Sequence, residues 1–209
     1  MRTLPRFWCL LVGGVGLAHP AQIAAQVRVE LGPIVALYEP AGSFHSTPYL
    51  NANLPTDPSD NGGLAWGGQG RLWLGPRVGI QVQAAIAATS RRVVTPAGLF
   101  HISARVVAAT VQGLYNLLPA SATQQLWLSA GPGVRNHGGE AYAPYGSPTP
   151  LAGVLGVGFV LPIMSRLKAN LGVTTLLYSF GLSDRTRSFA QSGFQVDLLL
   201  QAGLMLGWN

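Results

Sequence analysis

Cysteine, charged residues and long apolar runs are all scarce in this chain. Cys9 is the single cysteine, so the rest of the chain can form no disulfide, no thiolate nucleophile and no cysteine-based metal site. Charged residues make up 10% of the chain, against about 25% in a typical soluble domain. After residue 25 no apolar run is long enough for a membrane-spanning helix, which needs about 20 residues. These absences argue against both an ordinary soluble domain and a helical membrane protein.

The few charges are mostly basic. All but one of the 13 basic residues are arginine, and the formal net charge is +6. The arginines are scattered singly, and no basic run is interleaved with aromatic residues. Because nucleic-acid-binding segments cluster such residues, we expect no nucleic-acid partner.

The first 25 residues have the layout of a secretory signal peptide. Arg2 and Arg6 give a positive start, residues 7–17 form an apolar core, and small residues precede a cleavage position after Ala25. The apolar core is too short to span a membrane as a helix. Cys9 does not follow the apolar stretch, as a lipid-attachment cysteine would. We therefore expect residues 1–25 to be a signal peptide that is removed.

Residues 26–209 are expected to form one domain, and its composition is unusual. Glycine accounts for 27 of the 209 residues, roughly twice its usual share, and the mean hydropathy is positive. A secreted chain that is apolar overall, without a spanning helix, can satisfy its backbone hydrogen bonds in lipid only as a closed β-barrel. The composition therefore favours a membrane barrel.

The carboxyl-terminal stretch, residues 193–209, carries the clearest pattern. With a period of two, one face is continuously apolar, and the other carries Gln195, Asp197 and Gln201. The stretch is long enough to cross a bilayer as a tilted strand, which needs about 9–11 residues. The apolar face consists of Phe194, Val196, Leu198, Leu200, Ala202, Leu204, Leu206 and Trp208.

Seven earlier segments alternate in the same way, which makes eight strands. The connections alternate between long polar loops and tight turns, as in outer-membrane barrels with external loops and short periplasmic turns. We therefore predict an all-β fold, an eight-stranded antiparallel up-and-down transmembrane barrel that closes between its first and last strands. The other strands are predicted at residues 27–38, 64–74, 78–91, 102–117, 125–135, 151–161 and 166–180, and the long loops at 39–63, 92–101, 136–150 and 181–192.

With the apolar faces turned to lipid, the polar faces enclose a narrow lumen. Unpaired charges there would be costly, so we expect a polar network in which the two wall acids share the basic residues. An eight-stranded barrel has room for its own side chains or one small ligand, which favours a self-satisfied polar plug over a conducting pore. The predicted lumenal network consists of Arg28, Glu30, Arg71, Arg166, Lys168 and Asp197.

Two local registers stay open. Arg105 falls on the apolar face, so either a bulge shifts the register or Arg105 lies beyond the lipid. Trp66 and Trp73 differ in parity, so only one of them faces lipid unless Gly67 and Gly68 form a bulge. Aromatic residues at strand ends are typical of the girdles of outer-membrane barrels, and Tyr115, Phe194 and Trp208 have such positions.

This layout resembles the small outer-membrane β-barrels typified by the OmpA transmembrane domain, OmpX and OmpW. The resemblance lies in the pattern and not in a residue motif. It implies a monomer in the bacterial outer membrane with both termini in the periplasm and with membrane lipid and lipopolysaccharide around it. It also implies insertion by the outer-membrane assembly machinery, which reads a final strand ending in an aromatic residue; here Trp208 is penultimate and Asn209 follows.

Catalytic and metal-binding patterns are weak. His101 and Ser103 share a strand face and resemble the His-x-Ser of the lipid A deacylase barrels, but Ala104 and Arg105 do not continue that family's pattern. No HExxH-type metal spacing occurs. We expect no metal and no cofactor. Glycines in the predicted strand 151–161 are attributed to close packing inside the barrel: Gly153, Gly156 and Gly158.

The sequence therefore favours a non-enzymatic outer-membrane barrel with a structural, adhesive or small-solute role through its external loops. Two alternatives stay open. One is a lipid-modifying barrel enzyme that uses His101 and Ser103, and the other is a soluble secreted β-barrel with the apolar faces turned inward.

Overall fold

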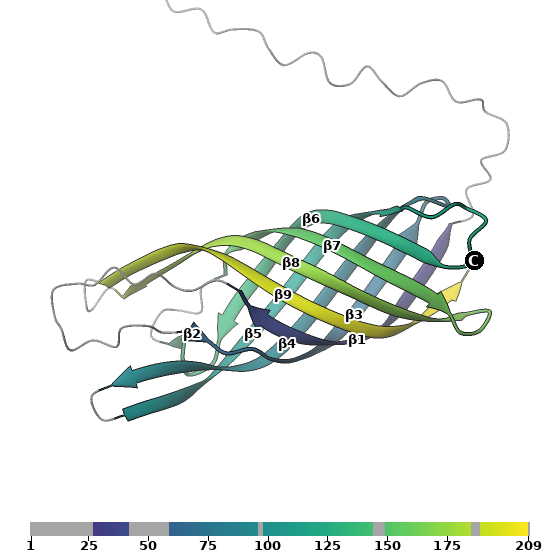
Figure 1. Cartoon of the computed structure of the whole chain (residues 1–209). Coiled ribbons are helices and arrows are strands. Elements are labelled where there is room, and N and C mark those ends of the chain that lie inside the picture. Colours follow the sequence, from purple (N-terminus) through teal and green to yellow (C-terminus); the bar gives the residue numbers. More distant parts are fainter. Residues whose placement is uncertain (1–26, 42–58, 96–97, 144–148, 185–188, 209) are drawn as a thin grey trace, which may run out of the picture.

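The computed structural model describes residues 27–41, 59–95, 98–143, 149–184 and 189–208. These residues form an all-β fold, a tilted cylinder of long antiparallel strands (Figure 1). No helix in the described ranges has the length and apolar character needed to cross a membrane. The predicted signal peptide, residues 1–25, lies outside the described residues.

Eight long strands make the wall, and each passes antiparallel to its neighbours. The two-residue β2 pairs with β4 just past the start of β3, so it prolongs the position of β3 in the wall. The strands are β1 (Arg28–Pro40), β2 (Ser59–Asp60), β3 (Gly63–Trp73), β4 (Val78–Thr95), β5 (Gly98–Asn116), β6 (Gln125–Gly138), β7 (Leu151–Pro162), β8 (Leu167–Asp184) and β9 (Phe189–Trp208).

The sheet closes between the first and last strands. β1 pairs with β9 from Val29 opposite Trp208 to Pro40 opposite Asp197, and β4 pairs with β5 along their whole length. Closure removes the exposed strand edges that an open sheet would present. The predicted eight-stranded up-and-down barrel, with its seam at the carboxyl-terminal strand, is confirmed.

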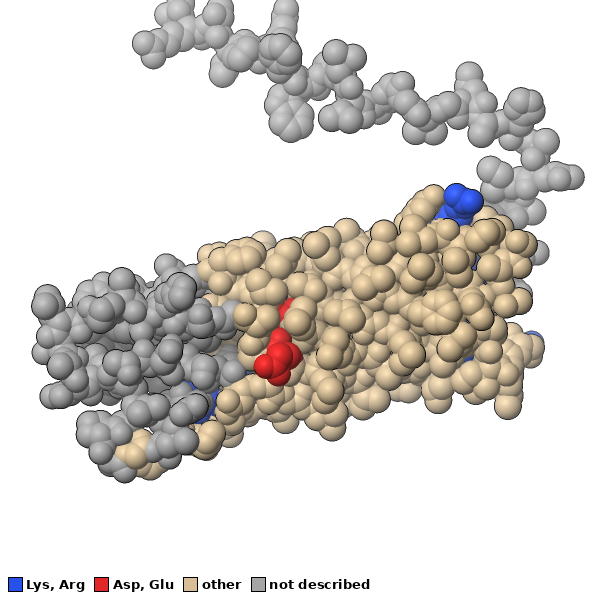
Figure 2. Space-filling model, in the orientation of Figure 1, with Lys and Arg blue, Asp and Glu red and all other residues tan. Residues whose placement is uncertain are grey.

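Side chains alternate between the two faces of the wall as the period of two predicts. On β9 the predicted outward set from Phe194 to Trp208 is exposed or half-buried, and Gln195, Asp197 and Gln201 are buried inside. Figure 2 shows the consequence, a flank that is tan from the red acidic group beside the grey residues almost to the opposite end. The soluble alternative is wrong, because its apolar faces would have to point inward.

Two predicted loops are largely strand. β4 and β5 continue to Thr95 and Gly98 through the predicted loop 92–101, and Arg92 pairs with His101. Likewise β8 and β9 reach Asp184 and Phe189. Pro96 and Gly98 predict a loop at 92–101, but the pairing of β4 with β5 reaches Thr95 and Gly98, so these residues mark the end of the hairpin and not the start of a long loop. The predicted loop between β1 and β3 lies mostly outside the described residues.

Both open registers are resolved without a bulge. β5 pairs with β4 in an uninterrupted register from Gly98 to Asn116, which leaves Arg105 on the outer face. β3 pairs with β1 without interruption past Gly67, so Trp66 points outward and Trp73 points into the lumen.

Glycines of β7 make room for an indole inside the barrel. A Cβ at Gly158 would lie 2.2 Å from the six-membered ring of Trp127, and one at Gly156 would lie 3.3 Å from it. Trp127 is fully buried, so β7 needs these two glycines for its close approach. The prediction of inward packing is wrong for Gly153, which faces outward with no atom closer than 3.9 Å to such a Cβ.

Candidate functional site

The barrel has two distinct ends. The turn end carries the short connections 74–77, 117–124 and 163–166 together with the first residues of β1 and the last of β9, and the loop end carries the remaining connections. Polar side chains fill the lumen between them.

The turn-end cluster forms around the carboxylate of Glu30. Arg28 Nε lies 2.9 Å from Glu30 Oε1, and Lys168 Nζ donates to the same oxygen at 2.5 Å. Trp73 Nε1 donates to Glu30 Oε2 at 3.1 Å. β1, β3 and β8 thus contribute two cations and one indole N–H to one buried acid, which supplies the partners that a buried charge requires.

Arg71 lies deeper in the lumen and joins opposite walls. Its Nε donates to Gln81 at 2.6 Å, and its Nη2 donates to Asn170 Oδ1 at 2.8 Å. The guanidinium carbon lies 4.6 Å from the ring centre of Trp127, within cation–π distance. β3, β6 and β8 are therefore held together across the middle of the barrel.

A layer of amides lies next to Arg71. Gln83 Nε2 donates to Gln201 Oε1 at 2.8 Å, which links β4 to β9 across the lumen. On the other side, Ser129 donates to Gln112 Oε1 at 2.6 Å. Amides both donate and accept, so such a layer can fill a narrow lumen without any charge.

The loop-end cluster consists of Arg135, Asp197, Tyr38 and Tyr178. Arg135 makes an ion pair with Asp197 and donates a hydrogen bond to the Tyr38 hydroxyl, which in turn donates to Asp197 Oδ1 at 3.3 Å. The Arg135 guanidinium also lies 5.1 Å from the ring centre of Tyr38 and 4.9 Å from that of Tyr178. Charge, hydrogen bonds and ring contacts together hold one fully buried arginine.

Further aromatic and basic side chains continue from this cluster toward the loop end. The ring of His137 lies 5.0 Å from Tyr142 and 6.0 Å from Tyr178, centre to centre. Arg91 lies 5.5 Å from the Tyr142 ring centre. His137, Tyr142 and Arg91 are all buried, so aromatic and basic side chains fill the lumen beyond the loop-end cluster.

The structure divides the predicted network into parts. Arg28, Glu30 and Lys168 come together, and Arg71 lies beyond them without an ion pair among the described residues. Asp197 does not share these basic residues, because its partner is Arg135. Arg166 is not in the lumen: it lies exposed in the turn before β8, where its carbonyl accepts the amide of Gly207.

Sequence reasoning missed Arg135. Its parity relative to the outward Val134 places it inside, and that signal was present in the sequence. Tyr38 and Tyr178 carried a weaker signal, because tyrosines near strand ends also occur in the outer girdles.

The lumen is filled by side chains at the level of Arg135 and Asp197. The gap beside Arg135 and Asp197 measures about 10 Å³, at the lower limit for one water molecule. Small alanines and larger aliphatic side chains complete this level: Ala65, Ala85, Ala87, Val106, Ala108, Leu176 and Leu199.

The weak catalytic pair lies on the outer face at the loop end. His101 and Ser103 are both exposed, and the Ser103 hydroxyl donates to Glu140 Oε2 at 3.4 Å. The ring of His101 faces the Asn61 amide at 3.4 Å, and no hydrogen bond joins His101 to Ser103 in the described ranges. The hydroxyl of Ser103 therefore contacts the carboxylate of Glu140 and not the ring of His101.

A metal site is absent from the part of the chain that the structure describes, where no three His, Cys, Asp or Glu side chains converge.

Comparison with solved structures places the fold among small outer-membrane barrels. The crystal structure of OprG from Pseudomonas aeruginosa matches with a TM-score of 0.68 at 10% identity, over 88% of this chain and 96% of that one. The solid-state NMR structure of AlkL in DMPC lipid bilayers matches with a TM-score of 0.61 at 12% identity, over 93% and 97%. No protein-family model and no curated protein matches the sequence.

Neisserial surface protein A also matches, with a TM-score of 0.50 at 11% identity over 86% of this chain and 96% of that one. All three are eight-stranded barrels of the outer membrane, and identities this low show a common fold only. The chain therefore has the fold of the small eight-stranded outer-membrane β-barrels.

Proposed function

We propose that this protein is a non-enzymatic outer-membrane barrel, closed to solutes, that acts through the strand ends and loops projecting from the outer leaflet. The packing of side chains across the lumen is the observation that carries this proposal. A pathway for solutes would have to pass the Arg135–Asp197 pair, the cross-lumen amides and Arg71, and the gap at the first of these holds at most one water.

The projecting part of the barrel supports a role outside the membrane. β4, β5, β8 and β9 contain 18, 19, 18 and 20 residues, whereas about 9–11 suffice to cross a bilayer. Figure 1 shows the β4–β5 and β8–β9 hairpins extending past the rest of the wall at the loop end. Rigid hairpins of this kind can present binding side chains at a fixed distance from the lipid.

The orientation belongs to the same proposal. Outer-membrane barrels keep their short turns in the periplasm and their longer loops outside. Both ends of the barrel wall, at β1 and β9, lie at the turn end, which supports periplasmic termini. The proposal also includes insertion by the assembly machinery, a monomeric state and contact with lipopolysaccharide.

Conductance across planar bilayers tests the closed lumen. The refolded protein is expected to leave the bilayer current unchanged, whereas a variant with Arg135→Ala and Asp197→Ala removes the side chains that close the loop end. Reproducible open-channel steps from the unmodified protein would overturn the proposal and favour a small-solute role.

A second candidate, a lipid-modifying enzyme, draws support from the Ser103–Glu140 contact and from the exposed His101 on the same face. It requires His101 to turn from Asn61 toward Ser103. Release of acyl chains from lipid A by the purified protein, lost in Ser103→Ala, would establish this activity. No release above that of Ser103→Ala would leave the non-enzymatic proposal in place.

A further inference from the structure

Arg105 is an exposed cation on the outer face of β5, where apolar side chains precede it. On β5 the outward positions run from Tyr115 through Val111, Ala109 and Val107 to Arg105. In the described ranges no ion pair or hydrogen bond involves the Arg105 side chain. An outward arginine costs about 2–4 kcal/mol at the bilayer midplane and about 0–1 near the interface, so its depth matters.

The spacing along β5 places Arg105 at the lipid headgroups. Ten residues separate Tyr115 from Arg105, which at about 3.3 Å per residue and a tilt of about 40° gives roughly 25 Å of height. An apolar band of an outer-membrane barrel is about 25 Å tall and ends in aromatic girdles. With Tyr115 in the turn-end girdle, the guanidinium therefore lies at the opposite interface.

The guanidinium extends sideways over a glycine. Gly138 of β6 lies opposite Arg105, and a Cβ at this glycine would be 3.5 Å from Arg105 Nη2. The absence of a side chain at Gly138 lets the guanidinium lie over the buried backbone of β6, and Arg105 itself stays exposed. Glu140, the nearby acid on this rim, contacts Ser103 instead, and Glu39 lies on β1. A planar donor of this kind suits the oxygens of a phosphate.

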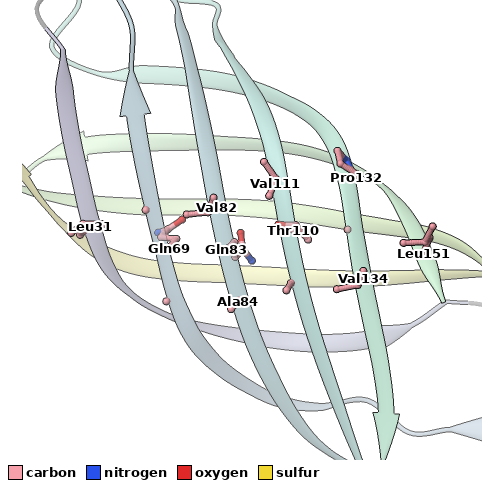
Figure 3. A pocket seen from close by; sticks show the side chains of 14 residues that line it. Leu31, Gln69, Val82, Gln83, Ala84, Thr110, Val111, Pro132, Val134 and Leu151 are labelled. Carbon is pink, nitrogen blue, oxygen red and sulfur yellow. The ribbon is translucent and has the colours of Figure 1, made fainter. Parts of the chain in front are cut away.

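An apolar groove lies on the same outer face, and its lining on β5 begins at Ala109, one outward residue beyond Val107 from Arg105. It has a volume of about 660 Å³, and Ala109 and Val111 belong to it (Figure 3). Its floor is made of small residues on neighbouring strands, and a Cβ at Gly68 would meet nothing closer than 3.8 Å. Exposed aliphatic side chains flank it: Leu31, Val82, Val111, Val134 and Leu151.

We propose that this face binds a phosphorylated, acylated lipid of the outer leaflet, with its phosphate on Arg105 and an acyl chain in the groove over Gly68 and Ala84. The proposal rests on the proposed membrane location but not on the closed lumen. Charge complementarity above and an apolar slot below match the two chemical parts of such a lipid. A second groove of about 650 Å³ on the other side of the barrel includes Leu37, Leu200 and Ala202, and the outward residue beyond Leu37 on β1 is the acid Glu39.

The two grooves supply matched controls. Arg105→Gln removes the charge, and Ala84→Leu fills the first groove from an outward position. Arg166→Gln is the control for Arg105→Gln, because it removes an exposed arginine at the turn end. Ala202→Leu is the control for Ala84→Leu, because it fills the second groove. Heat-modifiable gel mobility establishes that each variant has folded, and Arg105→Lys replaces Arg105→Gln if the latter does not fold.

Native mass spectrometry of the refolded protein with bisphosphorylated lipid A measures the binding. Arg105→Gln is expected to weaken retention about tenfold or more, because a charge-assisted hydrogen bond is lost. Ala84→Leu is expected to weaken retention to a similar degree, because the leucine occupies the groove of the acyl chain, while both controls bind as the unmodified protein does. Lipid A without phosphate is expected to bind the unmodified protein about as weakly as bisphosphorylated lipid A binds Arg105→Gln.

Unchanged retention in Arg105→Gln would overturn the proposal. The proposal would also be overturned if inorganic phosphate displaced the lipid and Ala84→Leu did not change its retention. The site would then hold a free phosphate and not a lipid. Channel activity of the unmodified protein would contradict the closed lumen and leave this inference standing.

Discussion

The two charged clusters of the lumen use the same pairing of acid with base but differ in their access to water. At the turn end, Glu30 is shared by Arg28 and Lys168, whose side chains are 28% and 14% exposed. At the loop end, Arg135 and Asp197 are each 1% exposed. A cation that reaches water can rehydrate when its partner is lost, whereas a buried one cannot. The clusters should therefore respond very differently to the same chemical change.

Asp197→Ala should have the largest effect. It leaves the Arg135 charge buried between Tyr38 and Tyr178 without an acid, which typically costs about 3–5 kcal/mol of the free energy of unfolding. Urea titration in lipid vesicles, read by heat-modifiable mobility, measures the loss. Asp197→Asn, which keeps the shape of the side chain, should lose most of the same stability.

A double replacement provides the control for the loop-end cluster. Arg135→Met with Asp197→Leu removes both charges and keeps the volume, so it should recover most of the stability that Asp197→Ala loses. If Asp197→Asn folds and inserts with undiminished stability, the pairing of Asp197 with Arg135 does not stabilise the barrel.

Glu30→Gln should have an intermediate effect. The amide keeps one acceptor for Lys168, and the two cations can turn toward water, so we expect a loss of about 1.5–3 kcal/mol. The same urea titration measures it. A loss equal to that of Asp197→Ala would show that access to water does not separate the two clusters.

Arg28→Gln should have the smallest measurable effect, up to about 1 kcal/mol, since Arg28 is partly exposed and Lys168 still pairs with Glu30. Arg166→Gln is its matched control, because Arg166 lies exposed in the adjacent turn. Urea midpoints that shift equally in the two variants would contradict a stabilising role for Arg28 in the turn-end cluster.

The barrel and its faces followed from the alternation in sequence, because in lipid the period of two turns apolar side chains outward and most polar side chains inward along each strand. The polar wall around Glu30, including Arg28 and Lys168, followed for the same reason. The seam between β1 and β9 followed from the need to close the sheet.

Partners across the lumen could not be predicted in the same way. The alternation of side chains along each strand predicts that Arg135 and Asp197 point inward. Which side chains meet depends on the stagger between strands around the cylinder, and the alternation carries no information on that stagger. Arg166 was misplaced because alternation does not mark the residue at which a strand begins. The lengths of β4 and β5 were underestimated because Pro96 and Gly98 predict a loop.

Tryptophan quenching by brominated lipids tests the central claim most directly, namely that the apolar face meets lipid and the other face encloses the lumen. Of the 5 tryptophans, Trp8 lies in the predicted signal peptide. Trp66 and Trp208 are 58% and 44% exposed on the outer face, and Trp73 and Trp127 are 1% and 0% exposed inside.

Single-tryptophan variants, with phenylalanine at the other positions, are refolded into vesicles that contain brominated lipid. We predict strong quenching of Trp66 and Trp208 and almost none of Trp73 and Trp127. Quenching of Trp73 or Trp127 as strong as that of Trp66 would contradict the assignment of the two faces, and with it the barrel described here.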